Sequence, residues 1–229
     1  ELMETELGGG TTQHVWEGLT NGVDYRFRVR AHNLAPEPSD WSGWSAAEHP
    51  AGRPGKPAGA MTAERVNDPL GGGVTVTWPA MTQAEANGEP ITSYLITGTA
   101  GVSASVDGGT SSHVLRGLDP DTSYSFTITA ENSEGRGPAS AASNTVVPWA
   151  VPEAPTGVKA SLPDAATGTG PNGRATVSWS PAAGNGTAVK DYVVRWNGGS
   201  RTVPAGTTSV TVDGLANGTA YRFTVQARN

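Results

Sequence analysis

The sequence predicts an all-β chain built from domain-sized repeats, and three observations lead to this prediction. The first is an internal repeat with a period close to one hundred residues. The second is the alternation of apolar and polar residues in short runs, which is typical of half-buried strands. The third is an abundance of turn formers, 31 glycines and 17 prolines, spread between those runs without a collagen period. No window shows the sustained 3.6-residue periodicity of an amphipathic helix.

The repeat is clearest in three segments, residues 18–33, 117–132 and 214–229. Each segment begins with Gly-Leu, continues through a turn to a tyrosine, and ends in an alternating run that closes on asparagine. The tyrosines lie 99 and 97 residues apart, at Tyr25, Tyr124 and Tyr221. A period of this length indicates domains that each have a core of their own, because solenoid turns repeat at much shorter spacing.

The alternation predicts the individual strands. In residues 124–130 aromatic and aliphatic side chains occupy one face, and serines and threonines occupy the other. Residues 74–78 and 175–179 show the same pattern, and residues 94–96 and 192–196 predict one further strand in each repeat. Turn signals separate the predicted strands at Gly71-Gly72-Gly73, Asn87-Gly88, Asn185-Gly186 and Asn197-Gly198.

Several anchors recur in a fixed order. Trp78-Pro79 and Trp179-Ser180-Pro181 end the second strand of two repeats, and a tyrosine follows on the third strand. The motif Gly-Leu-x-x-x-Thr-x-Tyr at residues 117–124 then precedes the sixth strand. This order resembles the fibronectin type III family, whose immunoglobulin-like sandwich has seven strands in sheets A-B-E and C-C′-F-G. The resemblance implies a tyrosine corner, in which the phenol bonds backbone a few residues upstream. The implied core and corner residues are Leu19, Tyr25, Trp78, Leu118, Tyr124, Trp179, Leu215 and Tyr221.

The repeats differ in how much of the pattern they contain. Residues 1–50 contain only the expected E, F and G strands, residues 51–149 contain a complete repeat, and residues 150–229 lack the last strand. An incomplete sandwich exposes an unpaired strand edge, so these parts are expected either to be trimmed from longer domains or to be complemented by another chain. The chain begins with Glu1 rather than methionine, which favours a processed or excised fragment. Proline-rich joints between the repeats are expected to act as semi-rigid spacers.

A second motif lies on the expected G strand of the first repeat. Residues 41–45 read Trp-Ser-Gly-Trp-Ser, and the preceding F strand has arginines at period 2, on the face opposite its apolar side chains. Indole rings and guanidinium planes on neighbouring strands can stack through cation–π contacts. The pattern is similar to the Trp-Ser-x-Trp-Ser ladder of type I cytokine receptors, although the cysteines of the receptors' partner domain are absent. The predicted structural ladder consists of Arg26, Arg28, Arg30, Trp41 and Trp44.

Composition argues against several classes of function. The formal net charge of −6 at pH 7, with no evident basic face, argues against nucleic-acid binding. The absence of cysteine excludes thiol catalysis, disulfides and thiolate metal sites. No apolar stretch approaches the roughly 20 residues of a membrane-spanning helix, so no membrane insertion is expected.

Motifs for enzymatic chemistry are also missing from the sequence. There is no Gly-x-Ser-x-Gly, and the glycine runs precede no helix that could hold a phosphate. Asp119 and Asp121 flank a proline on the E–F turn and supply too few oxygen ligands for calcium. The histidines show no metal-binding spacing: His14, His32, His49 and His113. We therefore expect no enzymatic activity, no cofactor and no metal.

The expected function is a non-enzymatic extracellular or cell-surface segment, namely a stalk, spacer or adhesive module of a longer protein. Its protein or carbohydrate partner is not identified by any motif. The F–G loop of the second repeat contains Arg136-Gly137 without a following aspartate, so integrin recognition through that tripeptide is not expected. The alternative is an accessory module of a secreted polysaccharide-degrading enzyme, since the family often joins catalytic and carbohydrate-binding domains.

Overall fold

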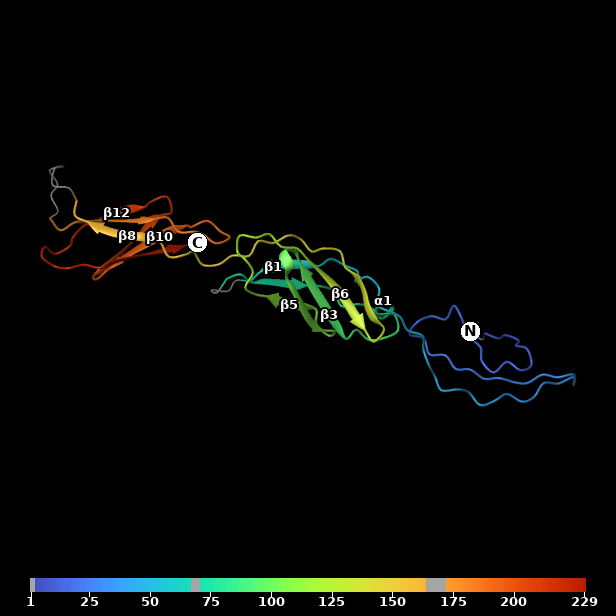
Figure 1. Ribbon diagram of the computed structural model, residues 1–229. Coiled ribbons are helices and arrows are strands. Elements are labelled where there is room, and N and C mark those ends of the chain that lie inside the picture. The colour runs from blue at the N-terminus through green and yellow to red at the C-terminus, as the bar shows by residue number, and fades with distance from the viewer. Residues whose placement is uncertain (1–2, 67–70, 164–171) are drawn as a thin grey trace.

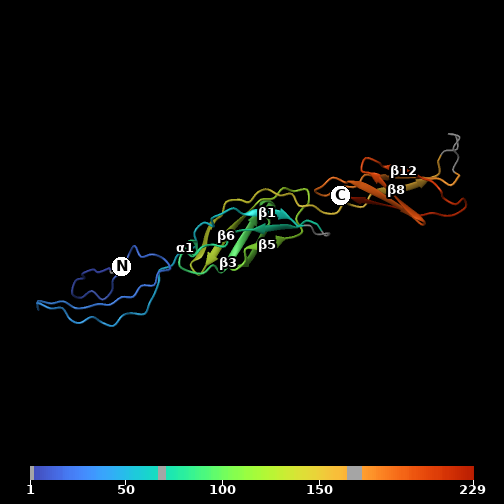
Figure 2. The same cartoon turned by 180° about the vertical axis from the view of Figure 1, so that it is seen from behind.

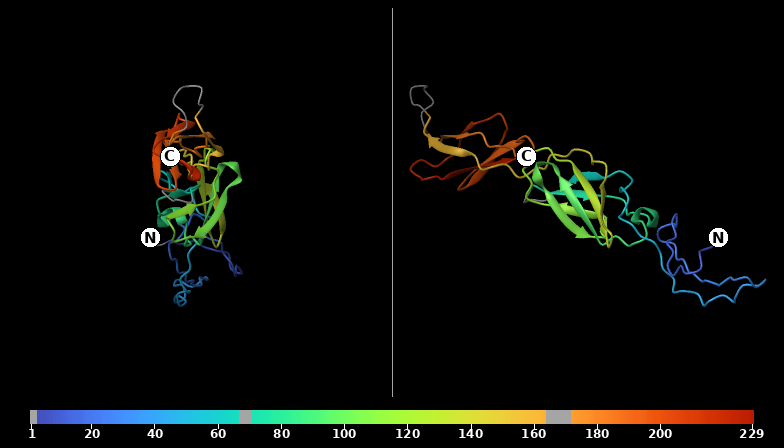
Figure 3. Two further views of the ribbon diagram at one scale, coloured as in Figure 1. Left: turned by 90° about the vertical axis from the view of Figure 1, so that its left-hand side faces the viewer. Right: turned by 45° about the vertical axis from the view of Figure 1, so that its right-hand side comes forward.

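The computed structural model describes residues 3–66, 71–163 and 172–229. The first fifty residues, a middle domain and a third domain follow one another in a row, as both Figure 1 and the reverse view in Figure 2 show. Seen end on, these parts lie one behind another (Figure 3, left). The chain is therefore extended. No helix among the described residues is long and apolar enough to cross a membrane.

The middle domain is a sandwich of two antiparallel sheets. In spatial order, one sheet contains β1 (Thr62–Arg65), β2 (Val74–Thr77) and β5 (Ser112–Leu115). The other contains β4 (Ser103–Asp107), β3 (Ser93–Gly98), β6 (Phe126–Asn132) and β7 (Gly135–Ala139). These orders correspond to the A-B-E and C′-C-F-G sheets that the resemblance implies. The prediction of an all-β sandwich fold is confirmed.

The third domain repeats this arrangement with six strands. One sheet contains β12 (Ser209–Val212), β9 (Ala175–Ser180) and β8 (Thr156–Ser161). The other contains β11 (Gly199–Pro204), β10 (Asp191–Trp196) and β13 (Phe223–Arg228). The pairings are antiparallel, and they correspond to strands E-B-A and C′-C-F.

Each sandwich is centred on a tryptophan that packs on a tyrosine. In the middle domain Trp78 lies 5.6 Å from Tyr94 between ring centroids, and in the third domain Trp179 lies 5.5 Å from Tyr192. All four rings are buried. Removing a ring of this size from water stabilises the fold by roughly 4–6 kcal/mol as an upper bound. The Nε1 groups of Trp78 and Trp179 are buried without a hydrogen-bond partner, so packing holds both indoles in place.

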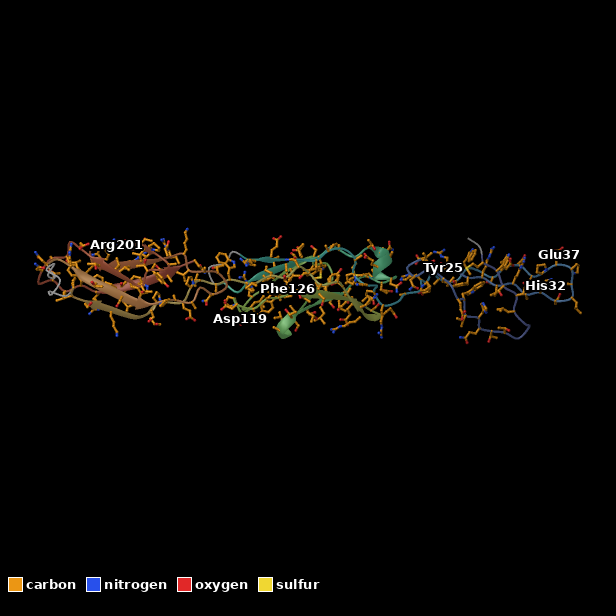
Figure 4. All side chains as sticks on the ribbon, turned by 90° about the horizontal axis from the view of Figure 1, so that it is seen from above. Tyr25, His32, Glu37, Asp119, Phe126 and Arg201 are labelled. Atoms are coloured by element: carbon orange, nitrogen blue, oxygen red, sulfur yellow. The ribbon has the colours of Figure 1, made fainter. Side chains whose placement is uncertain are left out.

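The period-2 pattern of β6 is reproduced in its burial. Phe126, Ile128 and Ala130 are buried, whereas the threonines between them are partly exposed. Phe126 points into the space between the two sheets in Figure 4. Leu118 and Tyr124 belong to the same core cluster, and Leu215 packs against the core of the third domain.

The G segment of the middle domain departs from a regular strand after β7. Its backbone N–H groups at Ser140, Ser143 and Val146 donate to carbonyls two residues apart on the neighbouring F segment, at Ile128, Phe126 and Tyr124. Three residues on one segment therefore face two on the other, which matches the three-residue period of polyproline II backbone. The hydroxyls of Ser140 and Ser143 accept a second bond from the N–H groups of Ile128 and Phe126.

The first fifty residues use the same pairing. Ser39, Ser42 and Ser45 donate their N–H groups to the carbonyls of Ala31, Val29 and Phe27. Their hydroxyls accept from the N–H groups of the same three residues. The described residues of this part contain no regular β-strand. Its apolar face is exposed to solvent, with Val29 69% exposed and Phe27 38% exposed.

A short helix and a 3-10 turn interrupt the all-β pattern of the middle domain; the 3-10 turn, η1 (Thr99–Gly101), lies between β3 and β4. Helix α1 (Gln83–Ala86) lies in the connection between β2 and β3, where the sequence shows no helical periodicity. Its cause is local. Thr82 accepts from the backbone of Glu85, and the Glu85 carboxylate accepts in return from the backbone of Thr82, which forms a capping box. Asn87 ends the turn in the left-handed conformation, with φ of 60°.

Candidate functional site

The predicted tyrosines fix the turns that lie at the ends of the domains. Tyr25, Tyr124 and Tyr221 each accept a hydrogen bond at the phenol oxygen from a backbone N–H five residues upstream, at 3.0, 3.1 and 3.0 Å. Tyr25 lies at the end of the first part that faces the middle domain, and Asp119 at the end of the middle domain that faces the third (Figure 4). The tyrosine corners of the first two parts therefore position two turns at the two joints.

At the first joint, the turn of the first part contacts the α1–β3 connection of the middle domain. The Asn21 Nδ2 group donates to Asn87 Oδ1 at 2.8 Å, and the Gly22 N–H donates to the Pro50 carbonyl at 2.9 Å. Gly22 and Gly88 meet closely, since a Cβ on Gly22 would lie 3.1 Å from the Gly88 Cα. Both glycines also have positive φ, so this contact requires glycine twice.

At the second joint, the equivalent turn of the middle domain contacts the β9–β10 connection of the third domain. The Gly186 N–H donates to Asp121 Oδ1 at 2.9 Å. A Cβ on Gly186 would clash with the carbonyls of Pro120 and Pro148, and its φ is +81°. Asp121, which the sequence places on the E–F turn, therefore joins two domains.

Each linker is held by a matching pair of asparagines. Asn87 Nδ2 donates to the Arg53 carbonyl, and Asn185 Nδ2 donates to the Val151 carbonyl, both at 2.9 Å. Asn87 and Asn185 both have positive φ, at 60° and 52°. The corresponding backbone bonds also recur, because Gly52 N–H donates to the Asn87 carbonyl and Ala150 N–H donates to the Asn185 carbonyl.

The last residue of the repeated sequence motif completes this arrangement. Asn132 Nδ2 donates to the carbonyls of Gly52 and Ala86, at 2.8 and 3.1 Å. Asn229 Nδ2 donates to the carbonyls of Ala150 and Gly184, both at 2.8 Å. One end of the F strand thus ties the linker to the loop that contacts the preceding domain. We use the term linker clamp for these two sets of bonds, made by Asn87 and Asn132 at the first joint and by Asn185 and Asn229 at the second.

Prolines reinforce the linkers through burial. Pro54 and Pro148 are among the fully buried side chains, although both belong to segments that connect domains. Trp149 is half-buried, and its carbonyl accepts from the Gly72 N–H at 2.7 Å, so the second linker is also bonded to the middle domain. The linkers are therefore packed parts of the domains that they connect.

A charged group is present at the first joint and not at the equivalent place in the second. His49 Nδ1 lies 3.2 Å from Asp24 Oδ1, and His49 Nε2 lies 3.4 Å from Glu89 Oε1. The hydrogen bond to Asp24, followed by that to Glu89, raises the pKa of His49 above its ordinary value of 6.5. Asp24 belongs to the first part and Glu89 to the middle domain, so the imidazole bridges them.

Three cation–π contacts involve arginines and tryptophans of the first part. The guanidinium of Arg28 lies between the two indoles, 4.4 Å from the Trp41 centroid and 4.5 Å from that of Trp44. Arg30 lies 4.5 Å from the Trp41 centroid and bonds Glu4 at 3.2 Å. The structure records no such contact for Arg26 among the described residues. The serines of the motif do not stack; they bond the F segment, as described above.

The remaining candidate groups do not converge. No cluster of three or more metal-ligating side chains occurs within the described ranges. Of the other histidines, His14 packs edge-on against Trp16 at 5.1 Å, and His32 lies near the far tip of the first part (Figure 4). An open hollow of about 530 Å³ adjoins the second joint and is lined by Asp121, Asn185 and Tyr192 among others. Two of its polar side chains, Asp121 and Asn185, already make the hydrogen bonds of the second joint.

The residues of the linker clamp carry signals in the sequence that coincide with ordinary turn and strand-end signals. Asn-Gly stands at equivalent positions in two repeats, and each repeated segment closes on asparagine. Taken alone, these patterns predict a turn and the end of a strand, and they do not indicate a contact with the linker. The serine spacing at Ser39, Ser42 and Ser45 was a further available signal, since a period of three indicates polyproline II backbone rather than a pleated strand.

Taken together, the fold and joints define a tandem array of immunoglobulin-like β-sandwiches with bonded linkers. Comparison with known proteins identifies the family to which the chain belongs. Residues 61–146 and 163–229 match the fibronectin type III domain, and the chain belongs to the fibronectin type III family.

Relatives of the chain include bacterial hydrolases and animal adhesion proteins. It is 34% identical over 164 residues to endoglucanase B of Cellulomonas fimi, covering 69% of this chain and 15% of that protein. It is 34% identical over 158 residues to chitinase A1 of Niallia circulans, covering 68% and 21%. It is 25% identical over 238 residues to the neuronal cell adhesion molecule of Rattus norvegicus, covering 93% and 18%. The chain thus spans about a fifth or less of the length of these relatives.

Among solved structures, the chain is similar to the FN1–FN3 domains of chicken CNTN1. The sequence identity is 18% and the TM-score 0.39, over 91% of this chain and 72% of that one.

Proposed function

We propose that this chain is a semi-rigid, non-enzymatic spacer within a longer extracellular protein, which holds its neighbours at a set separation. The observation that carries the proposal is the linker clamp, which occurs with equivalent bonds at both joints. Flexible connection requires no such bonds, because a glycine- and serine-rich linker would join the domains without them. The repeated use of asparagine and proline at the joints favours a defined geometry.

The proposal of a non-enzymatic role rests on what the conspicuous side chains do. The buried aromatic rings form the cores, the tyrosine hydroxyls fix turns, and the joint asparagines bond the linkers. The titratable groups with shifted pKa values do not lie together in one site. Each takes part in a contact of its own, such as the ion pair of Asp191 with Arg228.

Two settings for such a spacer follow from the relatives. The matches to an endoglucanase and a chitinase favour an accessory segment of a secreted polysaccharide-degrading enzyme. The match to a neuronal cell adhesion molecule favours a cell-surface stalk or adhesive module. We propose the spacer role for both settings. We favour the polysaccharide-degrading enzyme over the cell-surface stalk, because the sequence identity to the endoglucanase and the chitinase is higher than that to the adhesion molecule.

We also propose that the ladder in the first part is structural, as in the cytokine-receptor motif that it resembles. Stacking of Arg28 between Trp41 and Trp44 spans the F and G segments on their exposed face. The middle domain has Thr127, Ala139 and Ala142 at the equivalent places, so the ladder is particular to the first part.

Small-angle scattering of the whole chain tests the spacer role. The matched variant is the double substitution Asn87→Gly and Asn185→Gly, because glycine keeps the left-handed backbone while removing the amide. We expect the wild-type chain to scatter as a narrow set of extended shapes and the variant to show a shorter mean maximum dimension. Asn33→Gly, at the far tip of the first part, is the control. An unchanged profile in the double variant would refute a spacer stiffened by these bonds.

A binding assay separates the spacer from a carbohydrate-binding module. The chain is mixed with insoluble cellulose or chitin and sedimented. A spacer is expected to stay in the supernatant, whereas depletion from it would show that the segment binds polysaccharide itself.

A further inference from the structure

The first joint contains a histidine whose two ring nitrogens face two different carboxylates. Asp24 approaches Nδ1 from the first part, at 3.2 Å, and Glu89 approaches Nε2 from the connection before β3, at 3.4 Å. These are the charged groups that the described structure brings against the imidazole, and both are anionic. Neutral imidazole has one N–H donor and one bare nitrogen, so it can donate to only one carboxylate. Only the protonated ring satisfies both.

The second joint provides an internal comparison. The bridge between Tyr25 and Glu48 corresponds to that between Tyr124 and Val146, so the residue that follows, His49, corresponds to Val147. The partners differ as well, since Asp24 and Glu89 correspond to Ser123 and Thr187. The linker clamp is shared by both joints, and the imidazole bridge is found at the first.

We propose that His49 is a pH-dependent latch that closes the first joint in acidic surroundings and releases it as the pH rises. The protonated ring joins Asp24 of the first part to Glu89 of the middle domain. Loss of the proton removes one of the two hydrogen bonds and both charge attractions. The hydrogen bonds from Asn21 to Asn87 and from Gly22 to Pro50 involve no titratable group, so their contribution is the same at every pH. All three side chains of the latch belong to this chain, so the proposal is the same for either setting of the spacer.

The direction of the pH dependence follows from the raised pKa of His49. A group whose pKa is higher in the closed joint than in the open one favours closure fully below its ordinary value of 6.5. That contribution is lost as the pH rises through the raised value. Because the His49 ring and Asp24 are exposed and Glu89 is partly exposed, solvent screens the bridge. We expect a change of about two- to fivefold in the ratio of closed to open joint.

Pulsed electron paramagnetic resonance on the whole chain measures this ratio. The chain has no cysteine, so labels go only where cysteine is introduced. One pair, Thr12→Cys with Ser112→Cys, spans the first joint. A second pair, Ser112→Cys with Thr202→Cys, spans the second. We expect the first distance distribution to be narrow at pH 5.5 and broader at pH 8.5, and the second to be unchanged.

The variant His49→Val, which copies the second joint, separates the latch from general effects of pH. We expect it to give the broad distribution of the first pair at both pH values. The proposal is overturned if the wild-type distribution is the same at both pH values, whether narrow or broad. It is equally overturned if His49→Val retains the pH dependence.

Histidine nuclear magnetic resonance provides a second readout that does not depend on labels. We expect the pKa of His49 to lie above its ordinary value of 6.5 and to fall in Glu89→Gln, which keeps the size of the side chain and removes its charge. A pKa of His49 that is not raised above 6.5, or that is unchanged in Glu89→Gln, would show that the bridge does not form in solution.

Discussion

Replacing Asn132 with alanine is the most direct test of how the linker clamp is coupled to the fold. The Asn132 side chain is 4% exposed and makes three hydrogen bonds. Its Nδ2 donates to the carbonyls of Gly52 and Ala86, and its Oδ1 accepts from the Glu134 N–H at 2.9 Å. Alanine leaves two carbonyls and one N–H without this partner. The cost of leaving buried polar groups unpaired is about 1–3 kcal/mol each, less where water replaces the amide.

Water access at the linker decides where in this range the total lies. The Gly52 carbonyl belongs to a half-buried segment, and the Glu134 N–H lies in the exposed turn before β7, so water can reach both. We therefore expect Asn132→Ala to destabilise the middle domain by about 2–4 kcal/mol. This corresponds to roughly 30- to 900-fold in the equilibrium constant for opening.

Native-state hydrogen exchange on the whole chain is the assay, because it reports each domain separately. Exchange of the most protected amides in β3 and β6 is expected to accelerate by that factor, while β9 and β10 of the third domain remain unchanged. Asn33→Ala, whose exposed side chain bonds only the Ala35 N–H among the recorded contacts, is the matched control. Acceleration of less than threefold in β3 and β6 would refute the reasoning.

Three further predictions concern the corner, the ladder and an ion pair. Tyr124→Phe removes the acceptor of the Asp119 N–H and is expected to destabilise the middle domain by about 1–3 kcal/mol, which calorimetry detects as a lower thermal midpoint. An unchanged midpoint would count against the corner. Trp44→Ala removes one of the two indoles that flank Arg28 and is expected to increase protease cleavage within residues 25–48, with Val23→Ala as control. The hydrogen bonds to Arg228 lower the pKa of Asp191 below its ordinary value of 3.8. The ion pair therefore stabilises the third domain above pH 3.8, and this stabilisation is lost as the pH falls through the lowered pKa. In Asp191→Asn, the stability of the third domain, followed by acid unfolding, should no longer change with pH in this range.

The sequence is informative about the fold because the strands are encoded locally. In β6 every second residue is buried, and the alternation alone identifies the face toward the core. Trp78 and Trp179 each end the second strand of a repeat and precede a tyrosine on the third strand, and both tryptophans are buried in the core. Such patterns survive because a one-residue slip would turn the whole apolar set toward solvent.

The helix turn and the joints were not predicted, and the reasons differ. Helix α1 is too short to show a period, and only the spacing of Thr82 and Glu85 in the capping box marks it. The joint bonds connect residues far apart in the chain, such as Asn21 with Asn87. No local pattern indicates which turn of one domain meets which loop of the next. Arg26 differs again, because period 2 places it on the correct face but does not place an indole beside it.

The choice of asparagine at positions 87 and 185 shows how local and interdomain requirements coincide. Each position has positive φ, which glycine, asparagine and aspartate adopt with the least strain. Each side chain must also donate a hydrogen bond to a linker carbonyl, which glycine and ionised aspartate cannot do. Asparagine satisfies both conditions. The glycine that follows, at positions 88 and 186, is required because the preceding domain or its linker lies where a Cβ would be. An Asn-Gly pair that resembles an ordinary turn is therefore also the contact that sets one domain against the next.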